Sequence, residues 1–413
     1  MPNLVSVQYA TTGQSTSTNN MGMRQMQQKV YTKRASQYLI IKAPPASGKS
    51  RALMYIALDK LLHQGLKKVI VCVPERSIGS SFGFTELSQG GFESDWKPSE
   101  RFNLCTPGNE GKVSLFKEFL VSNEEILICT HHTLRFAFET LEAKQFTNCL
   151  LAIDEFHHVS ADDNNKLGVL LKKIISGSNA HIIAMTGSYF RGDSVPVLLP
   201  EDESKFDKVT YNYYDQLNGY TYLKTLGIGY HFYTGKYTSA IGEVLNTDQK
   251  TILHIPSVNS GESTKHKETE VHAILDIIGT FVDKDPETEV ITMRRKDGKL
   301  IKVADLVEDD SKKRNKIVQY LNSITKPEDM DLIIALGMAK EGFDWPFCEH
   351  ALTVGYRGSM TEIIQIIGRA TRDSSNKTHS QFTNLIANPD ATSQEVKLSV
   401  NNSASSRIHQ PKV

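Results

Sequence analysis

The sequence predicts an α/β protein with two mostly parallel β-sheets, each flanked by helices. The chain has 413 residues, more than one hydrophobic core usually supports, since domains commonly hold about 100 to 200 residues. Short apolar runs rich in β-branched residues alternate with amphipathic stretches, which is typical of parallel strands joined by helices. This series occurs twice, with an aromatic segment between the two copies, so we expect two domains.

The first domain is expected over residues 21–195. Its strands are predicted from apolar runs, and the stretch 50–68 has the pattern of an amphipathic helix. Residues 1–20 are rich in Ser, Thr and Asn with little apolar content, and we expect them to form a flexible arm. The apolar runs are 38–44, 68–74, 125–130, 148–156 and 180–188.

A bridging segment is expected over 196–245, where tyrosines are frequent and the alternation lapses. Its aromatic part, 211–233, has two interpretations: rings that stack on nucleic-acid bases, or a tyrosine-rich strand pair packed against the core, which β-propensity favours. The second domain is expected over 246–385, followed by a polar tail at 386–413. Its predicted strands are 251–258, 288–293, 331–338 and 350–356, and its predicted helices are 267–284, 311–324 and 359–372.

The composition excludes several classes of protein. Lys plus Arg equals Asp plus Glu at 47 each, so the chain lacks the basic excess of many nucleic-acid-binding proteins. The 5 cysteines are scattered without CxxC spacing, which argues against a zinc module and a disulfide framework. No apolar run approaches the roughly 20 residues of a membrane helix. Residues 1–20 do not resemble a secretory signal, so we expect a cytoplasmic protein.

Residues 43–50, with the sequence APPASGKS, follow a predicted strand and begin a predicted helix, which is the context of a phosphate-binding loop. In such a loop, backbone N–H groups and the helix N-terminus surround a nucleotide phosphate. Lys49 would neutralise phosphate charge, and the Ser50 hydroxyl would be a ligand of Mg²⁺. The flanking strand and helix disfavour the alternative of an incidental turn. The loop residues expected around the phosphate are Pro45, Ala46, Ser47 and Gly48.

Asp154 and Glu155 end an apolar run and are followed by His157. In a P-loop ATPase, a strand end about a hundred residues after the loop carries the second carboxylate site. Asp154 would hold Mg²⁺, partly through water, and Glu155 would deprotonate the attacking water, since a divalent ion keeps both carboxylates ionised. His157 would relay between the nucleotide and the second domain. The alternative for Asp154 and Glu155 is a solvated strand end. A metal site built from adjacent histidines is disfavoured, because neighbouring side chains on a strand point to opposite faces of the sheet.

Six stretches together resemble the motifs of superfamily-two helicases of the DExH type, related to DEAD/DEAH-box proteins and to the motors of restriction and phage-defence enzymes. The stretches follow the family's order over about residues 21–375 of the chain. After the phosphate loop, the most specific is QxxGRxxR, which requires four fixed residues in eight positions. The six stretches are 23–27, 43–50, 154–157 (DEFH), 186–188 (TGS), 341–346 (EGFDWP) and 365–372 (QIIGRATR).

The resemblance implies two tandem RecA-like domains with ATP bound between them and Mg²⁺ as the cofactor. Gln27, with Arg24 beside it, would read the adenine, and Gly342 and Asp344 would contact the nucleotide. Ala46 stands where many relatives have glycine, which puts the loop geometry there in question.

The resemblance also assigns roles to residues outside the phosphate loop and the paired carboxylates. Gln365, Arg369 and Arg372 recur at i, i+4 and i+7, so a helix would present them on one face. The two arginines would be fingers that stabilise the γ-phosphate in the transition state, worth about 10³-fold or more in rate. Their alternative is a solvated helix surface. Thr186 and Ser188 would couple hydrolysis to domain movement.

Nucleic-acid contacts are implied at loops that match the family's, where hydroxyls and single arginines suit phosphate contacts without sequence preference. The alternative is ordinary turn chemistry. The contact residues implied are Arg76, Ser77, Thr130, His131, Thr133 and Ser257.

The interpretation as a whole is an ATP-dependent helicase or translocase that moves on nucleic acid, with DNA favoured over RNA, in a defence or restriction setting. A protein partner that supplies a nuclease or another effector activity is expected, and a membrane is not. One alternative is a translocase on duplex DNA that does not separate the strands. Another is an ATP-gated nucleic-acid-binding or signalling module.

Overall fold

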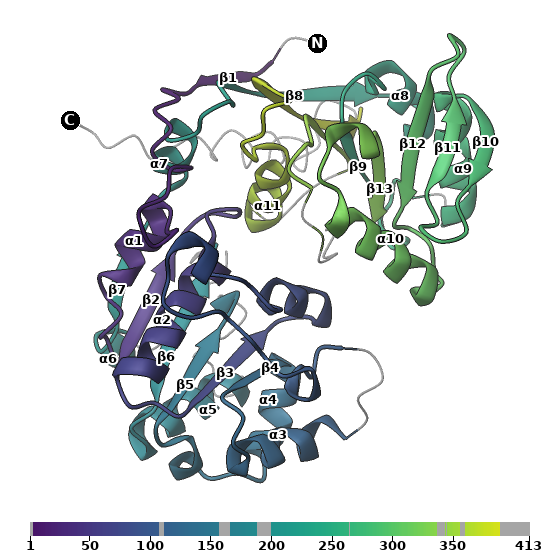
Figure 1. Ribbon diagram of the computed structural model, residues 1–413. Coiled ribbons are helices and arrows are strands. Elements are labelled where there is room, and N and C mark those ends of the chain that lie inside the picture. The colour runs from purple at the N-terminus through teal and green to yellow at the C-terminus, as the bar shows by residue number, and fades with distance from the viewer. Residues whose placement is uncertain are drawn as a thin grey trace. The chain divides into compact units, whose positions relative to one another are not determined.

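The structure is a computed structural model that describes residues 3–106, 111–156, 166–187, 200–263, 265–336, 343, 345–355 and 360–388. Contacts within the chain divide it into two units. The first, here called the loop unit, is Gly13–Gln216, and the second, here called the arginine unit, joins Met1–Thr12 to Leu217–Val413. Figure 1 labels the elements of both units, which are described separately. Within the described residues, no helix is long and apolar enough to cross a membrane.

The loop unit is built on a six-stranded sheet whose neighbouring strands are all parallel, in the order β4-β3-β5-β6-β2-β7. The strands are β2 (Tyr38–Lys42), β3 (Lys68–Val73), β4 (Ile126–Thr130), β5 (Cys149–Ile153), β6 (His181–Thr186) and β7 (Asp207–Thr210). The helices are α1 (Gln25–Tyr31), α2 (Lys49–His63), α3 (Lys112–Val121), α4 (His131–Phe138), α5 (Lys166–Gly177), α6 (Pro200–Glu203) and α7 (Tyr213–Asn218).

Helices cover both faces of this sheet (Figure 1). Val69 and Val71 of β3 belong to the cluster formed with α1 and α2, whereas Ile70 and Cys72 belong to the cluster formed with α3, α4 and α5. Side chains alternate across a strand, so strands buried on both faces are apolar throughout, as the sequence pattern predicted. Because the strands are parallel, the segments that follow β2, β3, β4, β5 and β6 all emerge at one edge of the sheet.

The arginine unit has a nine-stranded sheet in the order β1-β8-β15-β14-β9-β13-β12-β11-β10. Its central pairs are parallel, and antiparallel pairs occur at both edges. The strands are β1 (Val5–Gln8), β8 (Thr225–Tyr233), β9 (Thr251–Ile255), β10 (Thr280–Lys284), β11 (Ile291–Arg294), β12 (Leu300–Asp305), β13 (Leu332–Leu336), β14 (His350–Val354) and β15 (His379–Ala387). The helices are α8 (Tyr237–Val244), α9 (Lys267–Ile278), α10 (Ser311–Ser323) and α11 (Met360–Ala370).

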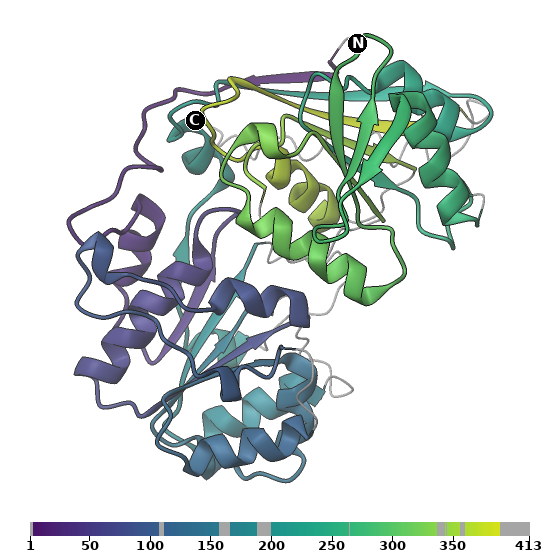
Figure 2. The same cartoon turned by 45° about the vertical axis from the view of Figure 1, so that its right-hand side comes forward.

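Two apolar clusters place these helices on opposite faces of the nine-stranded sheet. Ile317 of α10 and Ile366 of α11 share one cluster, whereas Ile241 of α8 and Ile274 of α9 share the other. Figure 2 shows α10 and α11 in green and yellow-green on the same side of the sheet. The arginine unit is therefore a three-layer α/β unit, and the predicted fold class is confirmed for both units.

The division of the chain differs from the predicted one at two places. Residues 1–20 were expected to be a flexible arm, but Val5–Gln8 form strand β1, which pairs antiparallel with β8. The segment 196–245 was expected to be a separate bridge, but β7 completes the first sheet while β8 and α8 belong to the second unit. Backbone hydrogen bonds to distant strands explain both differences, because short polar or aromatic stretches give no local signal of such pairing.

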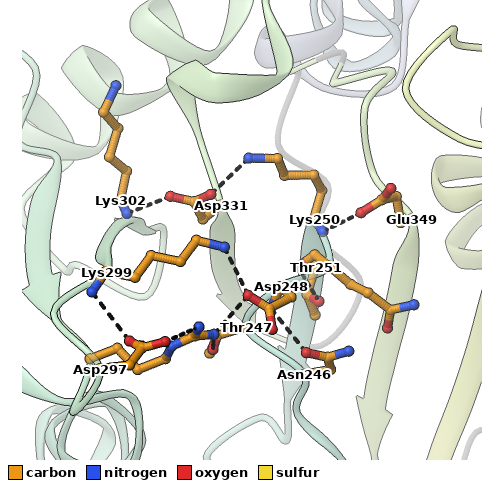
Figure 3. Close-up of polar contacts among 12 residues, drawn as sticks. Asn246, Thr247, Asp248, Lys250, Thr251, Asp297, Lys299, Lys302, Asp331 and Glu349 are labelled. Atoms are coloured by element: carbon orange, nitrogen blue, oxygen red, sulfur yellow. Dashed lines mark hydrogen bonds and ion pairs between the residues drawn. The ribbon is translucent and has the colours of Figure 1, made fainter.

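Strands β11 and β12 form a hairpin and pair antiparallel. Arg295 Nη1 and Lys299 Nζ contact the Asp248 carboxylate at 2.8 and 2.9 Å, and Lys250 Nζ contacts Asp331 at 2.7 Å (Figure 3). Lys250 and Asp331 directly precede β9 and β13. This network therefore fastens the hairpin at the amino edge of the sheet, the edge opposite the strand ends that carry site residues in α/β folds.

Candidate active site

The phosphate loop runs from the end of β2 to the first residue of α2. The Ala43 N–H donates to the Thr186 carbonyl at 3.1 Å, so the loop starts pinned to the end of β6. Gly48 has φ +86° and Ala46 has φ +65°, both in the left-handed region. A residue with a Cβ costs about 1–2 kcal/mol there, so the departure from glycine at Ala46 is a strained position in the loop.

Two side chains of the loop equip it for an anion. Lys49 Nζ donates to the carbonyls of Ala43 and Pro44 at 2.9 and 3.1 Å, so the ammonium lies over the loop. The Ser47 hydroxyl is buried and has no hydrogen-bond partner among the described residues. A buried hydroxyl without a partner is costly, and a phosphate oxygen would satisfy it. The free N–H groups at the start of α2 favour a negative charge at the same place.

Gln27 of α1 holds the loop from outside. Its Oε1 accepts from the Arg24 N–H at 2.8 Å, and its Nε2 donates to the Gly48 carbonyl at 3.3 Å. A Cβ at position 48 would lie 2.5 Å from Gln27 Nε2, closer than any contact a real Cβ makes. Gly48 is thus favoured by its backbone angle, and a Cβ there would displace the amide at the end of the Gln27 side chain. Gln27 is buried, whereas Arg24 is exposed.

A third contact to the loop comes from Gln216 of α7, which the sequence analysis missed. Its side-chain Nε2 donates to the Pro45 carbonyl at 3.1 Å, and its backbone carbonyl accepts from the Ser15 hydroxyl at 2.8 Å. Gln216 is only 3% exposed. No local pattern could have found it, because 171 positions separate it from its partner in the loop.

The carboxylates follow β5 at the same edge of the sheet. Asp154 is 6% exposed, its N–H donates to the Cys72 carbonyl at 2.8 Å, and its Oδ1 accepts from the Glu155 N–H at 3.0 Å. Glu155 has φ +48°, a left-handed conformation that is strained for glutamate. His131 Nε2 donates to the Asp154 carbonyl at 3.0 Å. Backbone strain and buried carboxylates together are typical of functional sites.

The sheet order brings the predicted residues together. β6 lies between β2 and β5, so the loop and Asp154 are separated by about 10 Å, which is two strand spacings. Thr186 at the end of β6 is fully buried between them. The Ser50 hydroxyl and the Asp154 carboxylate offer oxygen donors at one edge, which are the ligands that Mg²⁺ prefers. The residues present therefore fit a nucleotide with its Mg²⁺.

In the arginine unit, Gln365 and Arg369 lie on α11. Arg369 Nη1 donates to the Phe343 carbonyl at 3.3 Å, and its guanidinium carbon lies 4.7 Å from the centre of the Phe343 ring. Arg372, which was expected on the same helix face, lies outside α11 because the helix ends at Ala370.

Lys377 and Ser380 bind the last carbonyl of α11. The buried Nζ of Lys377 donates to the Ala370 carbonyl at 2.8 Å, and the Ser380 hydroxyl donates to the same carbonyl at 2.6 Å. Both bonds satisfy a carbonyl that has no partner within the helix. Burial lowers the pKa of Lys377 to about 8.

Four predicted site residues, His157, Ser188, Gly342 and Asp344, lie outside the described residues.

A cavity of about 630 Å³ lies at the same edge of the loop unit, between the segments that follow β3 and β4 and the start of α3. The rings of His132 and Phe136 have centroids 4.5 Å apart, and Phe136 is 37% exposed. The lining thus combines an aromatic pair with two basic residues, Arg76 and Lys112, and one acidic residue, Glu75. Its members are Pro74, Glu75, Arg76, Gly111, Lys112, Val113, Thr130, His132, Thr133 and Phe136.

Only some of the residues predicted to contact nucleic acid line this cavity. Arg76, Thr130 and Thr133 line it, whereas His131 is directed to the Asp154 carbonyl and its neighbour His132 takes the place at the lining. The Thr130 hydroxyl caps α4 by accepting from the Thr133 N–H at 3.2 Å. Ser77 is exposed beside Arg76, and Ser257 is exposed after β9 in the arginine unit.

The phosphate loop, the paired carboxylates and the parallel sheet that carries both define a P-loop ATPase. The family model of the DEAD/DEAH box helicases matches residues 24–191. A curated Bacillus subtilis (strain 168) protein named "Putative ATP-dependent helicase YeeB" is 64% identical over 402 residues, which cover 97% of this chain and 67% of that protein. The chain belongs to this family of ATP-dependent helicases.

Solved structures agree on the fold. The helicase MrfA, a DUF1998 helicase crystallised with DNA and AMPPNP, is 14% identical with a TM-score of 0.59, over 92% of this chain and 50% of that one. The Mycobacterium smegmatis helicase Lhr, bound to ssDNA and AMP-PNP, is 12% identical with a TM-score of 0.56, over 96% and 49%. The chain spans about half the length of both solved proteins. At this identity the likeness shows the fold, tandem RecA-like units.

Proposed function

We propose that the chain hydrolyses ATP at the phosphate loop in order to move on nucleic acid, with DNA preferred to RNA. The observation that carries the proposal is that the loop, the paired carboxylates and the cavity lined by Arg76 and Phe136 share one edge of one sheet. The structures of MrfA and Lhr, which have the same fold, both contain DNA and an ATP analogue. That common ligand supports DNA as the track.

At the loop, the chain's own groups bind and orient the triphosphate. The Lys49 ammonium, now on two loop carbonyls, would move to phosphate oxygens, and the Ser47 hydroxyl would gain its missing partner. Ser50 and Asp154 would hold Mg²⁺, which supplies positive charge to the phosphates when bound. Glu155 would accept a proton from the attacking water, a role worth about 10² to 10⁴-fold in rate.

Residues of the arginine unit and of β6 complete the proposed machinery. Arg369 and Arg372 would stabilise negative charge that develops as the phosphoryl group leaves, and Gln365 would position the attacking water beside them. Thr186, buried at the end of β6 and bonded through its carbonyl to the loop, would transmit the state of the nucleotide. The assigned roles of His157, Ser188, Gly342 and Asp344 rest on the motif resemblance.

At the cavity, the side chains suit a single strand. The Arg76 guanidinium is exposed for a phosphate. The Phe136 ring, tilted at 53° to His132 and with the Arg135 guanidinium 4.9 Å from its centre, is exposed enough to contact an unpaired base. Phosphate contacts of this kind do not depend on sequence. The proposed motor would therefore bind DNA of any sequence, with affinity that falls as salt rises. A setting in defence or restriction, with a partner that supplies a nuclease, follows only from the motif resemblance.

The test is an ATPase panel with the 413-residue chain, run without polymer and with poly(dT), duplex DNA and poly(U). We expect the largest stimulation with poly(dT), and a strand-displacement assay to detect unwinding that requires ATP. Stimulation by duplex DNA without displacement would favour the alternative of a duplex translocase. ATP-dependent binding of polymer without turnover would favour the gated binding module and contradict the proposal.

A further inference from the structure

We propose that His131 is the positioning residue through which nucleic acid in the cavity stimulates ATP hydrolysis. The inference rests on the proposed function, since it concerns how the two proposed ligands communicate. Its geometric basis is the hydrogen bond of 3.0 Å from His131 Nε2 to the Asp154 carbonyl. This bond joins the start of helix α4, which lines the cavity, to the residue proposed to hold Mg²⁺.

Asp154 is held by two segments that continue into the cavity wall. Its N–H is bound to the Cys72 carbonyl at the end of β3, two residues before Pro74. Its carbonyl is bound to His131, one residue before His132. Pro74 and His132 both line the cavity. The first connection extends the β-ladder and is rigid, so the His131 side chain is the adjustable connection.

The His131 bond fixes one particular peptide plane, that between Asp154 and Glu155. The carbonyl of this peptide accepts from His131, and its N–H donates to Asp154 Oδ1 at 3.0 Å. The peptide leads into the strained left-handed conformation of Glu155, φ +48°. A tilt of this plane would turn the Asp154 carboxylate and displace Glu155 together. One donor, His131 Nε2, therefore contacts the peptide that joins the two groups proposed to act in hydrolysis.

Helix α4 is a stiff connection between His131 and the cavity. The Thr130 hydroxyl caps its first turn, and Leu134 and Ala137 are buried in the core beneath it. His132 and Phe136 are four residues apart on the same helix face, toward the cavity, whereas His131 is turned by about 100° from His132. A base that stacks on Phe136 would shift the helix as one body and move His131 with it.

The chemistry of the bond prescribes the variants. A carbonyl oxygen only accepts, so His131 Nε2 must carry the proton, and a replacement must supply a donor at a similar distance from the backbone. His131→Gln places an amide N–H near the position of Nε2. His131→Asn is one methylene shorter and cannot reach, and His131→Leu fills the space without a donor. His132→Leu is the matched control, because it removes a cavity ring and leaves the bond to Asp154 intact.

The experiment measures ATP turnover of the full chain against poly(dT) concentration and separates two quantities. The first is the stimulation ratio, the ATP turnover rate at saturating poly(dT) divided by the rate without polymer. The second is the poly(dT) concentration that gives half of the maximal stimulation. We expect His131→Leu and His131→Asn to lower the ratio by roughly 5-fold or more, the usual lower range of coupling between sites, with half stimulation within about twofold of the parent. His131→Gln should restore most of the ratio. His132→Leu should raise the half-stimulating concentration and keep the ratio.

Each other outcome overturns the inference in a distinguishable way. If His131→Leu and His131→Asn keep the parental ratio, the bond carries no coupling. A higher half-stimulating concentration with an unchanged ratio would make His131 a direct nucleic-acid contact. If His131→Leu fails to fold, the comparison of His131→Asn with His131→Gln decides, and equal ratios in those two contradict the inference. If the parent itself shows no stimulation by any polymer, the proposed function fails first.

Discussion

Gly48→Ala is the change whose effect the structure defines most fully. The left-handed backbone at φ +86° would cost an added methyl group about 1–2 kcal/mol. The methyl would also lie 2.5 Å from Gln27 Nε2, which forces that amide away from the Gly48 carbonyl and removes a hydrogen bond worth about 1 kcal/mol. The two costs sum to about 2–3 kcal/mol. In the free variant, a rearranged loop would relieve both costs. ATP binding requires the original loop, so the costs would appear as weaker ATP affinity.

At about 1.4 kcal/mol per tenfold change, the dissociation constant for ATP should rise roughly 30- to 150-fold. The assay is equilibrium binding of a fluorescent ATP analogue by anisotropy. Gly65→Ala is the matched control, since Gly65 has φ +73° but a Cβ there would meet nothing within 4 Å. It should lower the melting temperature slightly and leave ATP affinity unchanged. Parental affinity in Gly48→Ala, or an equal loss in Gly65→Ala, would refute the loop geometry as the cause.

Three further changes separate the proposed roles. Glu155→Gln should bind ATP normally but hydrolyse it about 10² to 10⁴-fold more slowly, and single-turnover hydrolysis at the parental rate would remove Glu155 as the base. Arg372→Ala should also keep ATP affinity and lose about 10³-fold in rate, so weakened binding with unchanged turnover would contradict a finger role. Phe136→Ala should raise the half-stimulating poly(dT) concentration roughly 5- to 150-fold, from about 1–3 kcal/mol per stacked base, whereas Phe84→Ala, which removes an exposed ring outside the cavity lining, should not.

Local patterns were sufficient for the sheet cores and for the position of the phosphate loop between a strand and a helix. The run before Asp154 predicted a buried strand, and β5 is buried at all five positions. The APPASGKS stretch predicted a loop between a strand and a helix, and α2 begins at Lys49. Parallel strands then place both at one edge. In these cases the signal lies within the segment itself, in apolar runs and in glycine followed by lysine.

Pairings between distant segments escaped the sequence analysis. Strand β1 has only four residues and finds its partner β8 more than 200 positions away, so its polar surroundings looked like an arm. The contact of Gln216 with the Pro45 carbonyl is equally non-local. His131 was predicted as a nucleic-acid contact, but His132 lines the cavity instead. Nothing in a sequence distinguishes the imidazole that turns to a backbone carbonyl from the one that lines a cavity.

The end of α11 was missed for a related reason. The pattern QxxGRxxR fits a continuous helix face, but α11 ends at Ala370, whose carbonyl accepts from Lys377 and Ser380, and Arg372 lies beyond that end. The periodicity of a helix defines its end only to within one or two residues. The structure therefore places Gln365 and Arg369 on α11, as the spacing predicted, and Arg372 beyond its end.

The most direct test is ATP turnover of the parental chain and of Lys49→Ala, each with and without poly(dT). If the loop unit is an ATPase that responds to nucleic acid, the parent accelerates several-fold when the polymer is added, and the Lys49→Ala protein stays near the background rate in both conditions. A parental rate that ignores the polymer, or substantial turnover by Lys49→Ala, would contradict the account.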